Sequence, residues 1–338
     1  MSDGPHLCDP YVCSIVPTHI LRAISQSEAA HPRAREAATR ALAKTLHLRT
    51  LRAERVAGLG SGGQAGSIVP PHILSRVATT EGVSSEAQEA AQRTLSASQR
   101  LQAQREGVAE SLVTSKVTRE VYDAQNTEDL PGTPVRKEGE PQAKDKAINE
   151  CYDSLGYTFD LYAKVFDRNS INNTGMDLLG SVHYGQDFGN AMWDGYQMIF
   201  GDGDGHIFKV GKFTELVDVI GHELTHGVTQ YTANLRYQGQ SGALNESISD
   251  VFGIILKQYH LKQTPKEADW LIGEGIWADD VKGTALRSMK APGTAYDDPQ
   301  IGKDPQPAYM KDFNTGAEDN GEVCLLRAMK WLISGSYQ

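Results

Sequence analysis

Apolar residues in the middle of the chain recur with two different spacings. Residues 117–124 alternate between apolar and polar side chains, which predicts a β-strand, and residues 178–184 and 197–200 have the composition of shorter strands. Residues 147–166 place apolar side chains three and four positions apart, which predicts a helix. The segment 130–145 is rich in Pro, Gly and charged residues, so we expect a loop there.

Two further helices are predicted in the second half of the chain. One covers residues 214–231, and the other opens near Gly242, with Ser241 or a neighbour as its cap. Residues 201–205, which precede them, have the sequence Gly-Asp-Gly-Asp-Gly. A calcium loop is one interpretation, but the segment lacks the acidic ligand at the twelfth position of an EF-hand. We therefore favour a tight hairpin.

The first third of the chain contains an internal repeat. Residues 14–21, Ser-Ile-Val-Pro-Thr-His-Ile-Leu, recur as Ser-Ile-Val-Pro-Pro-His-Ile-Leu at residues 67–74, at an offset of 53. The pattern of each copy predicts an extended segment, then a short helix after the proline, and then a longer helix rich in Ala, Arg and Leu. We therefore define a first unit, residues 1–56, a Gly-rich linker, residues 57–66, and a second unit, residues 67–110.

Each unit is too small to bury a large core of its own, which leaves two interpretations. The units are either helical hairpins that serve as a spacer, or a cover over the remainder of the chain. Charge is compatible with a cover: of the net charge of −10 over 338 residues, residues 1–110 contribute +2 and the remainder −12.

Composition also excludes several classes of protein. The acidic net charge argues against a nucleic-acid partner, and no apolar run approaches the 18 residues of a membrane helix. The four cysteines are too few and too dispersed for a disulfide framework. The N-terminus has no charged segment followed by a long apolar run, so no secretory signal peptide is visible.

The predicted helix 214–231 contains His222, Glu223 and His226 in the pattern His-Glu-x-x-His. Residues four apart share one helix face, so both imidazoles can reach a single metal ion. Zinc suits such a site because it accepts neutral imidazole and leaves a position for water. Glu223 lies at the flank of this face, within reach of that water. The pattern is short, however, and two histidines on a surface helix would also produce it.

The second helix supplies two carboxylates, Glu246 and Asp250, that also lie four residues apart. Their neighbours are small or apolar, so uncompensated charges there would be costly. Glu246 can complete a His-His-Glu ligand set, and Asp250 can accept a hydrogen bond from one ligating histidine. We therefore predict one zinc ion bound by three residues, His222, His226 and Glu246.

These motifs resemble the thermolysin family of zinc metalloendopeptidases. The similarity extends over roughly residues 117–321 and includes Phe-Gly-Asn-Ala-Met-Trp at 188–193, Leu-Arg-Ser-Met at 286–289 and Asp-Asn-Gly at 319–321. It implies an α+β fold, in which an N-terminal catalytic lobe combines a mixed β-sheet with the active-site helices, and a catalytic domain over residues 111–321.

The repeated N-terminal units resemble the short propeptide of the protealysin subgroup of this family. That subgroup has one copy before the catalytic domain, whereas this chain has two. The resemblance implies that the units are small, helical and propeptide-like, and that the enzyme is made as a zymogen.

The resemblance implies that Glu223 is the general base, and it also assigns roles to residues outside the zinc motif. Tyr237 matches a residue that helps to hold the tetrahedral oxyanion, and Asp250 matches one that orients His222. Val219 and Leu286 are similar to walls of a pocket for an apolar side chain after the cleaved bond. Three residues match positions that bind the substrate backbone: Asn190, Ala191 and Arg287.

The family's calcium site is altered in this chain. Lys257 and Leu271 stand where the family carries acids, although three acids remain: Asp218, Asp269 and Glu274. A lysine opposes a divalent cation, so we expect zinc as the cofactor and do not expect the double-calcium site, although calcium binding stays open.

A second difference lies at the C-terminal end of the similarity. Cys324 stands where the family has the histidine that donates to the oxyanion, which would leave Asp319, the residue that orients this histidine, without its partner. Loss of one such donor typically costs about 10²–10³ in rate. Residues 322–338 form a divergent tail, and we expect a truncated helical subdomain and weak activity.

The sequence therefore predicts the precursor of a zinc metalloendopeptidase that acts on proteins or peptides and carries its own propeptide in cis. The alternatives are a truncated, catalytically impaired zinc-binding homologue and a propeptide-type inhibitor of another protease. Neither a nucleic acid nor a membrane is expected as a partner. The family resemblance implies secretion, and the absence of a visible signal peptide leaves a cytoplasmic precursor as the alternative.

Overall fold

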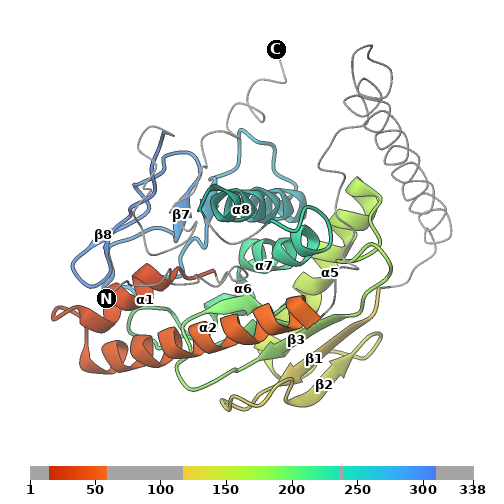
Figure 1. The fold of residues 1–338 in the computed structure, drawn as a ribbon, viewed down its shortest axis with the longest axis horizontal. Coiled ribbons are helices and arrows are strands. Elements are labelled where there is room, and N and C mark those ends of the chain that lie inside the picture. Colours follow the sequence, from red (N-terminus) through yellow and green to blue (C-terminus); the bar gives the residue numbers. More distant parts are fainter. Residues whose placement is uncertain (1–14, 59–116, 236–238, 310–338) are drawn as a thin grey trace, which may run out of the picture.

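A five-stranded mixed sheet forms one layer of the molecule (Figure 1). The computed structural model describes residues 15–58, 117–235 and 239–309. β1, β3 and β5 run parallel to one another, and β2 and β4 pair antiparallel at the two edges in the order β2-β1-β3-β5-β4. The strands are β1 (Arg119–Asp123), β2 (Thr133–Lys137), β3 (Leu178–Val182), β4 (Ala191–Trp193) and β5 (Met198–Phe200). Because β4 is an edge strand, one row of its backbone groups is left for another segment.

The structure confirms the predicted α+β fold and corrects two details of the strands. β1, β3 and β5 lie inside the three segments predicted as strands. The loop expected over residues 130–145 was wrong in part, because Thr133–Lys137 pairs with β1 as β2. Pro134 is tolerated there because an edge strand has unpaired backbone positions. β4 was also missed, since its three residues are too short for an alternating pattern.

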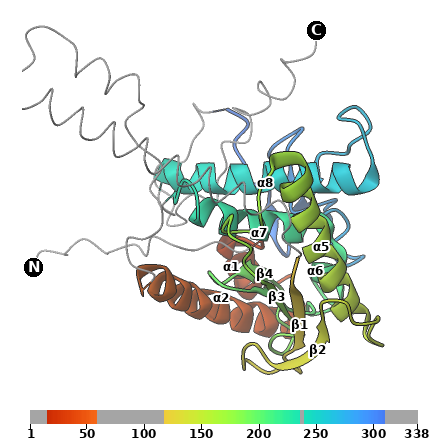
Figure 2. The ribbon, with the colours of Figure 1, turned by 90° about the vertical axis from the view of Figure 1, so that its right-hand side faces the viewer.

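The described residues from 117 onward are called the body below. Four helices of the body pack on and beside this sheet: α5 (Lys146–Phe166), α6 (Lys212–Glu215), α7 (Val217–Gln230) and α8 (Gly239–Leu261). α5 covers β1 and β3, and α7 packs against both α5 and α8 (Figures 1 and 2). The single helix predicted over residues 214–231 is interrupted at Leu216, whose extended backbone separates α6 from α7. Two short two-stranded sheets follow α8: β6 (Leu271–Ile272) with β7 (Arg287–Ser288), and β8 (Asp297–Asp298) with β9 (Gly302–Lys303).

The first N-terminal unit covers the body rather than standing apart from it. It forms the two predicted helices, α1 (Thr18–Gln26) and α2 (Pro32–Gly58), and residues 15 and 16 before them bend rather than form a strand. Its apolar side chains belong to the same hydrophobic core as those of the sheet and α7. Among them, Ile15, Val16, Ile20, Leu21, Ile24 and Ala34 have no exposed surface. The second unit, residues 67–110, lies outside the described residues, as do the linker from residue 59 onward and the tail, residues 322–338.

Ion pairs join α2 to the loops at the end of the sheet. Arg40 lies 2.8 Å from Asp187, and Lys44 lies 2.8 Å from Glu128. The basic side of the N-terminal unit therefore faces acidic residues of the body. In the described part of the chain, no helix is both long enough and apolar enough to cross a bilayer.

His183 ties three elements of the body together just after β3. Its Nδ1 lies 2.7 Å from Asp202 Oδ1, and its Nε2 lies 3.1 Å from Asp145 Oδ2. Asp145 is also the N-cap of α5, where its other oxygen accepts the backbone N–H groups of Ala147 and Ile148. The hydrogen bond to Asp202 is the main reason why the pKa of His183 is raised to about 9.

Replacement of His183 by glutamine is expected to destabilise the protein in a pH-dependent way. Since the folded-state pKa of His183 exceeds its unfolded value, the stabilisation is complete below about pH 6.5 and is lost as the pH rises through about 9. We expect the variant to lose about 2 kcal/mol of unfolding free energy at pH 6 and much less at pH 9.5. Urea unfolding at the two pH values measures this, and an equal loss at both would contradict the charged state of His183.

Candidate active site

Two buried histidines of α7 and one buried glutamate of α8 point toward a common centre. His222 and His226 are fully buried, and Glu246 is 6% exposed. The Nε2 atoms of the two histidines lie 2.9 Å apart, and the nearest Glu246 oxygens lie 3.5 Å from His222 Nε2 and 3.9 Å from His226 Nε2. One ligand atom from each residue lies within 4.8 Å of the others. The packing of α7 on α8 therefore brings the three predicted ligands together.

These separations fit a zinc ion. Ligand atoms about 2.0–2.1 Å from a tetrahedral zinc are roughly 3.3 Å from one another, and the three measured spacings lie on both sides of this value. Glu246 Oε1 is buried and has no hydrogen-bond partner among the described residues. Burial of a carboxylate oxygen without a hydrogen-bond partner lowers the stability of the fold, unless a cation binds to it.

Hydrogen bonds at the Nδ1 atoms orient both Nε2 atoms toward the common centre. His222 Nδ1 donates to Asp250 Oδ1 at 2.8 Å, and His226 Nδ1 donates to Asn245 Oδ1 at 2.8 Å. Because these oxygens only accept, each neutral ring carries its lone pair on Nε2. The two Nε2 atoms face each other across 2.9 Å, and a cation shared between them would bind both lone pairs.

Each histidine has a second fixed support. Asp250 is fully buried and accepts two hydrogen bonds from Arg287, from Nε at 2.8 Å and from the guanidinium NH2 nitrogen at 2.7 Å. The Ser249 hydroxyl lies 2.9 Å from His226 Nδ1, beside Asn245. The rings are therefore held from behind by groups on α8 and β7.

Electrostatics at the centre favour positive charge. Burial lowers the pKa of His222, but the hydrogen bonds to Asp250 and Glu246 outweigh it and raise this pKa to about 9. Burial raises the pKa of Glu246, but His226 and His222 have the larger combined effect and bring it well below its usual range. The carboxylates thus attract a cation even before any metal is considered.

Glu223 lies on α7 beside the two histidines and is fully buried. Its Oε2 accepts the backbone N–H of Trp193 at 2.9 Å. Trp193 is the last residue of β4, so the edge strand of the sheet orients this carboxylate. A charged acceptor held by a backbone donor has one preferred position, which suits a base that must meet a water molecule beside the metal.

The first N-terminal unit binds directly to the three residues predicted to hold a substrate backbone. Ile15 N–H donates to Ala191 O at 3.1 Å, and Arg287 donates to Ile15 O at 3.2 Å. Asn190 accepts from Val16 N–H at 2.8 Å and donates to Val16 O at 3.2 Å. Residues 15 and 16 therefore bind the start of β4 and its neighbours through their own backbone groups.

Two family models match consecutive parts of the chain. Residues 88–230 match the thermolysin metallopeptidase catalytic domain, and residues 233–326 match the thermolysin metallopeptidase alpha-helical domain. The chain belongs to the thermolysin family of metallopeptidases. The second match extends five residues into the segment 322–338 that the sequence analysis assigned to a divergent tail.

Individual relatives of this thermolysin-family chain point to the protealysin-like subgroup. It is 49% identical over 262 residues to an extracellular metalloprotease of Pectobacterium carotovorum subsp. carotovorum, covering 77% of this chain and 74% of the relative. It is 50% identical over 216 residues to protease PrtS of Photorhabdus sp. (strain Az29), of which it spans 58%. The solved precursor of protealysin from Serratia proteamaculans has a TM-score of 0.63 and 48% identity, with 80% of this chain and 81% of that chain covered.

The structure of this thermolysin-family chain includes most, but not all, of the predicted site residues. His222, Glu223, His226, Glu246 and Asp250 gather around one centre, with Asn190, Ala191 and Arg287 at its edge. Tyr237, Asp319 and Cys324 lie outside the described residues.

Sequence reasoning missed three supports of the site. Asn245 and Ser249 are polar positions next to predicted site residues on the same helix, and their spacing of four was a usable signal. The third support is the backbone N–H of Trp193, which has no counterpart in the sequence because every residue except proline carries one.

Proposed function

We propose that this chain is the precursor of a zinc endopeptidase in which His222, His226 and Glu246 bind the ion. The family membership supports a zinc metallopeptidase, and the comparisons do not favour an inhibitor or an impaired homologue. The observation that carries the assignment to these residues is the buried His-His-Glu cluster, whose ligand atoms face one another within 4.8 Å.

In this proposal Glu223 is the general base for hydrolysis of the peptide bond. When bound, zinc would supply the Lewis acidity that lowers the pKa of a water molecule and polarises the substrate carbonyl. Glu223 takes a proton from that water and then delivers it to the leaving amine nitrogen. The Trp193 N–H holds the carboxylate in place through both transfers. Asp250 and Asn245 keep the histidine rings oriented.

The substrate backbone is bound by the groups that now bind residues 15 and 16. Asn190 offers both an acceptor and a donor, Ala191 offers a carbonyl, and Arg287 donates to a carbonyl oxygen. Two buried apolar residues, Val219 and Leu286, support a preference for an apolar side chain after the cleaved bond. Tyr237 and Asp319 keep the roles that the family resemblance implies for them, in oxyanion binding and in orientation.

The first N-terminal unit is the propeptide in cis. It occupies the substrate-binding groups and buries five aliphatic side chains in the common core, so a substrate cannot bind before it leaves. We propose that residues 1–110 form the removable prosegment, that the catalytic domain covers residues 111–321, and that cleavage occurs between about residues 101 and 118. The extracellular relatives support secretion of the product.

A chelator-controlled peptidase assay tests this proposed function. The chain is incubated until its N-terminus lies in the window 101–118, as judged by mass spectrometry, and is then given a fluorogenic peptide. We expect hydrolysis that 1,10-phenanthroline abolishes and added zinc restores. A processed, folded and zinc-loaded chain without peptidase activity would overturn the proposal.

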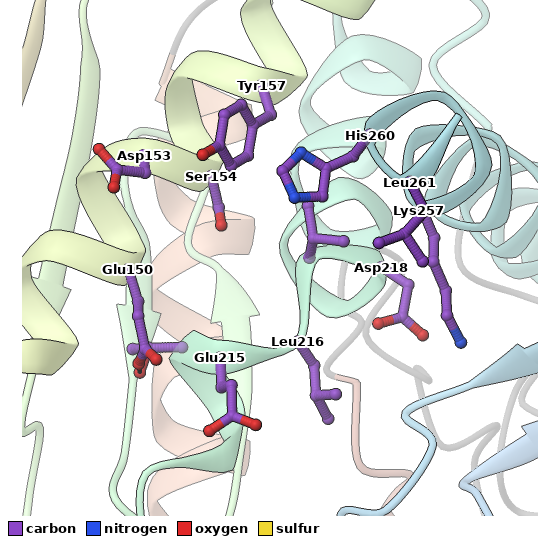
Figure 3. Close-up of a pocket in the computed structure, with 12 residues that line it drawn as sticks. Glu150, Asp153, Ser154, Tyr157, Glu215, Leu216, Asp218, Lys257, His260 and Leu261 are labelled. Atoms are coloured by element: carbon purple, nitrogen blue, oxygen red, sulfur yellow. Dashed lines mark hydrogen bonds between the residues drawn. The ribbon is translucent and has the colours of Figure 1, made fainter. Parts of the chain in front are cut away.

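The calcium site of the family is replaced here by a lysine. Lys257 Nζ lies 2.7 Å from Asp269 Oδ2, 3.3 Å from Glu274 Oε2 and 3.4 Å from Leu271 O. Asp218 is fully buried in the first turn of α7 and accepts the Gly273 N–H at 2.7 Å. Figure 3 shows Asp218 and Lys257 near the end of a pocket between α5, the α6–α7 junction and α8. We propose that the ammonium group neutralises these acids in place of calcium.

Replacement of Lys257 by glutamate is expected to make stability depend on calcium. The variant places four acids together without a cation, so we expect its unfolding free energy to be lower than that of the wild type by roughly 2–4 kcal/mol. Its unfolding temperature should be lower as well. Excess calcium should recover most of this loss, while the wild type should respond little. Thermal unfolding with calcium and with EGTA measures the effect. A calcium-dependent wild type would show that the ammonium does not substitute for the ion.

A further inference from the structure

The surface around Asn190, Ala191 and Arg287, on which the first copy of the repeat (residues 14–48) lies, is called the cleft below. We propose that the cleft has a second occupant in the same chain, residues 67–101, which can take the place of the first copy when that copy leaves. The inference rests on the proposed function only in identifying the cleft as the substrate site. If it is right, the duplication has a physical consequence: when the first unit alone is lost, the second copy still covers the site.

The hydrogen bonds of Ile15 and Val16 in the cleft do not use their side chains. Ile15 and Val16 bind Asn190, Ala191 and Arg287 through their backbone N–H and C=O groups alone. Any extended segment that presents the same backbone groups can make these four hydrogen bonds. The pair Ile68-Val69 stands at the matching position of the repeat and is followed by the same proline.

The apolar anchors of the first copy are conserved in the second. The fully buried aliphatic side chains of residues 15–26 have aliphatic counterparts: Ile15, Val16, Ile20, Leu21 and Ile24 correspond to Ile68, Val69, Ile73, Leu74 and Val77. Buried Thr18 corresponds to Pro71. The longer helix follows the same rule at four buried apolar positions: Ala34, Ala37, Ala38 and Leu48 correspond to Ala87, Ala90, Ala91 and Leu101. Buried Ala41 departs from it, because its counterpart is the polar Thr94. Because the cleft is packed at these positions, aliphatic residues of similar size are what it accepts.

Polar anchors are conserved in part. Thr45 Oγ1 accepts from Asn190 at 3.2 Å, and the second copy has a hydroxyl at this position, Ser98. Arg40, which pairs with Asp187, corresponds to Arg93. Two contacts are lost: Lys44 corresponds to Ala97, and His31, which stacks on His206, corresponds to Ser84. Glu128, the partner of Lys44, is 57% exposed, so loss of this ion pair weakens binding without preventing it.

Connectivity favours the second copy once the first has been displaced. Only residues 102–117 separate it from the body, whereas residues 49–117 separate the first copy from it. Sixteen extended residues span roughly 50 Å, enough to pass around a domain of this size. The shorter tether also raises the effective concentration of the second copy at the cleft by roughly ninefold.

Matched substitutions in the two copies test this inference in the full-length chain. Val16→Asp places a charge in the buried anchor of the first copy, Val69→Asp does the same in the second, and the third variant combines both. Access to the cleft is measured as the rate at which zinc-loaded protein loses zinc to 1,10-phenanthroline, and hydrolysis of a fluorogenic peptide is measured in parallel. Leu21→Asp, Leu74→Asp and their combination provide an independent set on α1 in case an aspartate at position 16 disturbs folding.

We expect each single variant to lose zinc within about twofold of the wild-type rate, and each double variant to lose it at least roughly tenfold faster. If either single variant of a folded chain is as fast as its double, the two copies do not substitute for one another and the inference is wrong. A double variant that opens the cleft but hydrolyses no peptide would overturn the proposed function and leave this inference standing.

Discussion

Replacement of Glu223 by glutamine is expected to abolish peptide hydrolysis while leaving zinc bound. Glutamine has the same shape, and its amide oxygen can still accept the Trp193 N–H that now binds Glu223 Oε2 at 2.9 Å. The amide cannot take up a proton, so the general-base contribution is lost, which lowers kcat by about 10²–10⁴. The measurement is kcat for a fluorogenic peptide, after removal of the N-terminal units, together with the zinc content of the same sample.

An exposed glutamate supplies the control for this variant. Glu267 lies at the surface in the turn after α8, where its carboxylate accepts from Thr264, and Glu267→Gln should leave kcat unchanged. A Glu223→Gln protein that retains full activity would show that Glu223 is not the base. A loss of zinc in parallel with activity would mean instead that Glu223 supports the metal site.

Replacement of Glu246 by alanine is expected to remove the metal itself. Glu246 supplies one of the three ligands in the cluster. Removal of a residue that only orients a metal ligand already lowers metal affinity by about 10–100-fold. We therefore expect zinc affinity to fall by at least about 100-fold. Peptide hydrolysis at limiting zinc should fall with it, because the water can no longer be activated.

Thermal unfolding provides a readout of this variant that does not depend on activity. A ligand that binds only the folded state raises its stability, by about 4 kcal/mol at 1,000 times Kd, so a chelator should lower the Tm of the wild type. The Tm of Glu246→Ala should not respond to the chelator, whereas Glu267→Ala should behave like the wild type. A variant with unchanged zinc content would exclude Glu246 as a ligand.

Local features of the chain were predictable because their causes are local. The helix spacing of His222, Glu223 and His226 places them on one side of α7 whatever surrounds the helix, and the same holds for Glu246 and Asp250 on α8. The repeat at an offset of 53 predicted two helices after an extended segment, and α1 and α2 have this form.

Elements whose stability comes from partners were not predictable in the same way. β2 contains a proline and charged residues, and it is a strand only because β1 lies beside it. β4 has three residues, too few for a pattern, yet it positions Glu223 and provides the edge that Ile15 joins. Lys257 predicted a defect in a calcium site, but only its position among Asp269, Glu274 and the Leu271 carbonyl suggests that the charge is replaced.

The sequence by itself determined the family to which the chain belongs, the proposed zinc ligands and the proposed base, because these depend on side-chain type and on spacing along one helix. Only the tertiary structure decided that α7 and α8 place the ligand atoms within 4.8 Å, that Asn245 and Ser249 hold His226, and that the first N-terminal unit covers the site. The physical reason is that these contacts join residues distant in sequence, and several of them use backbone groups that every residue shares.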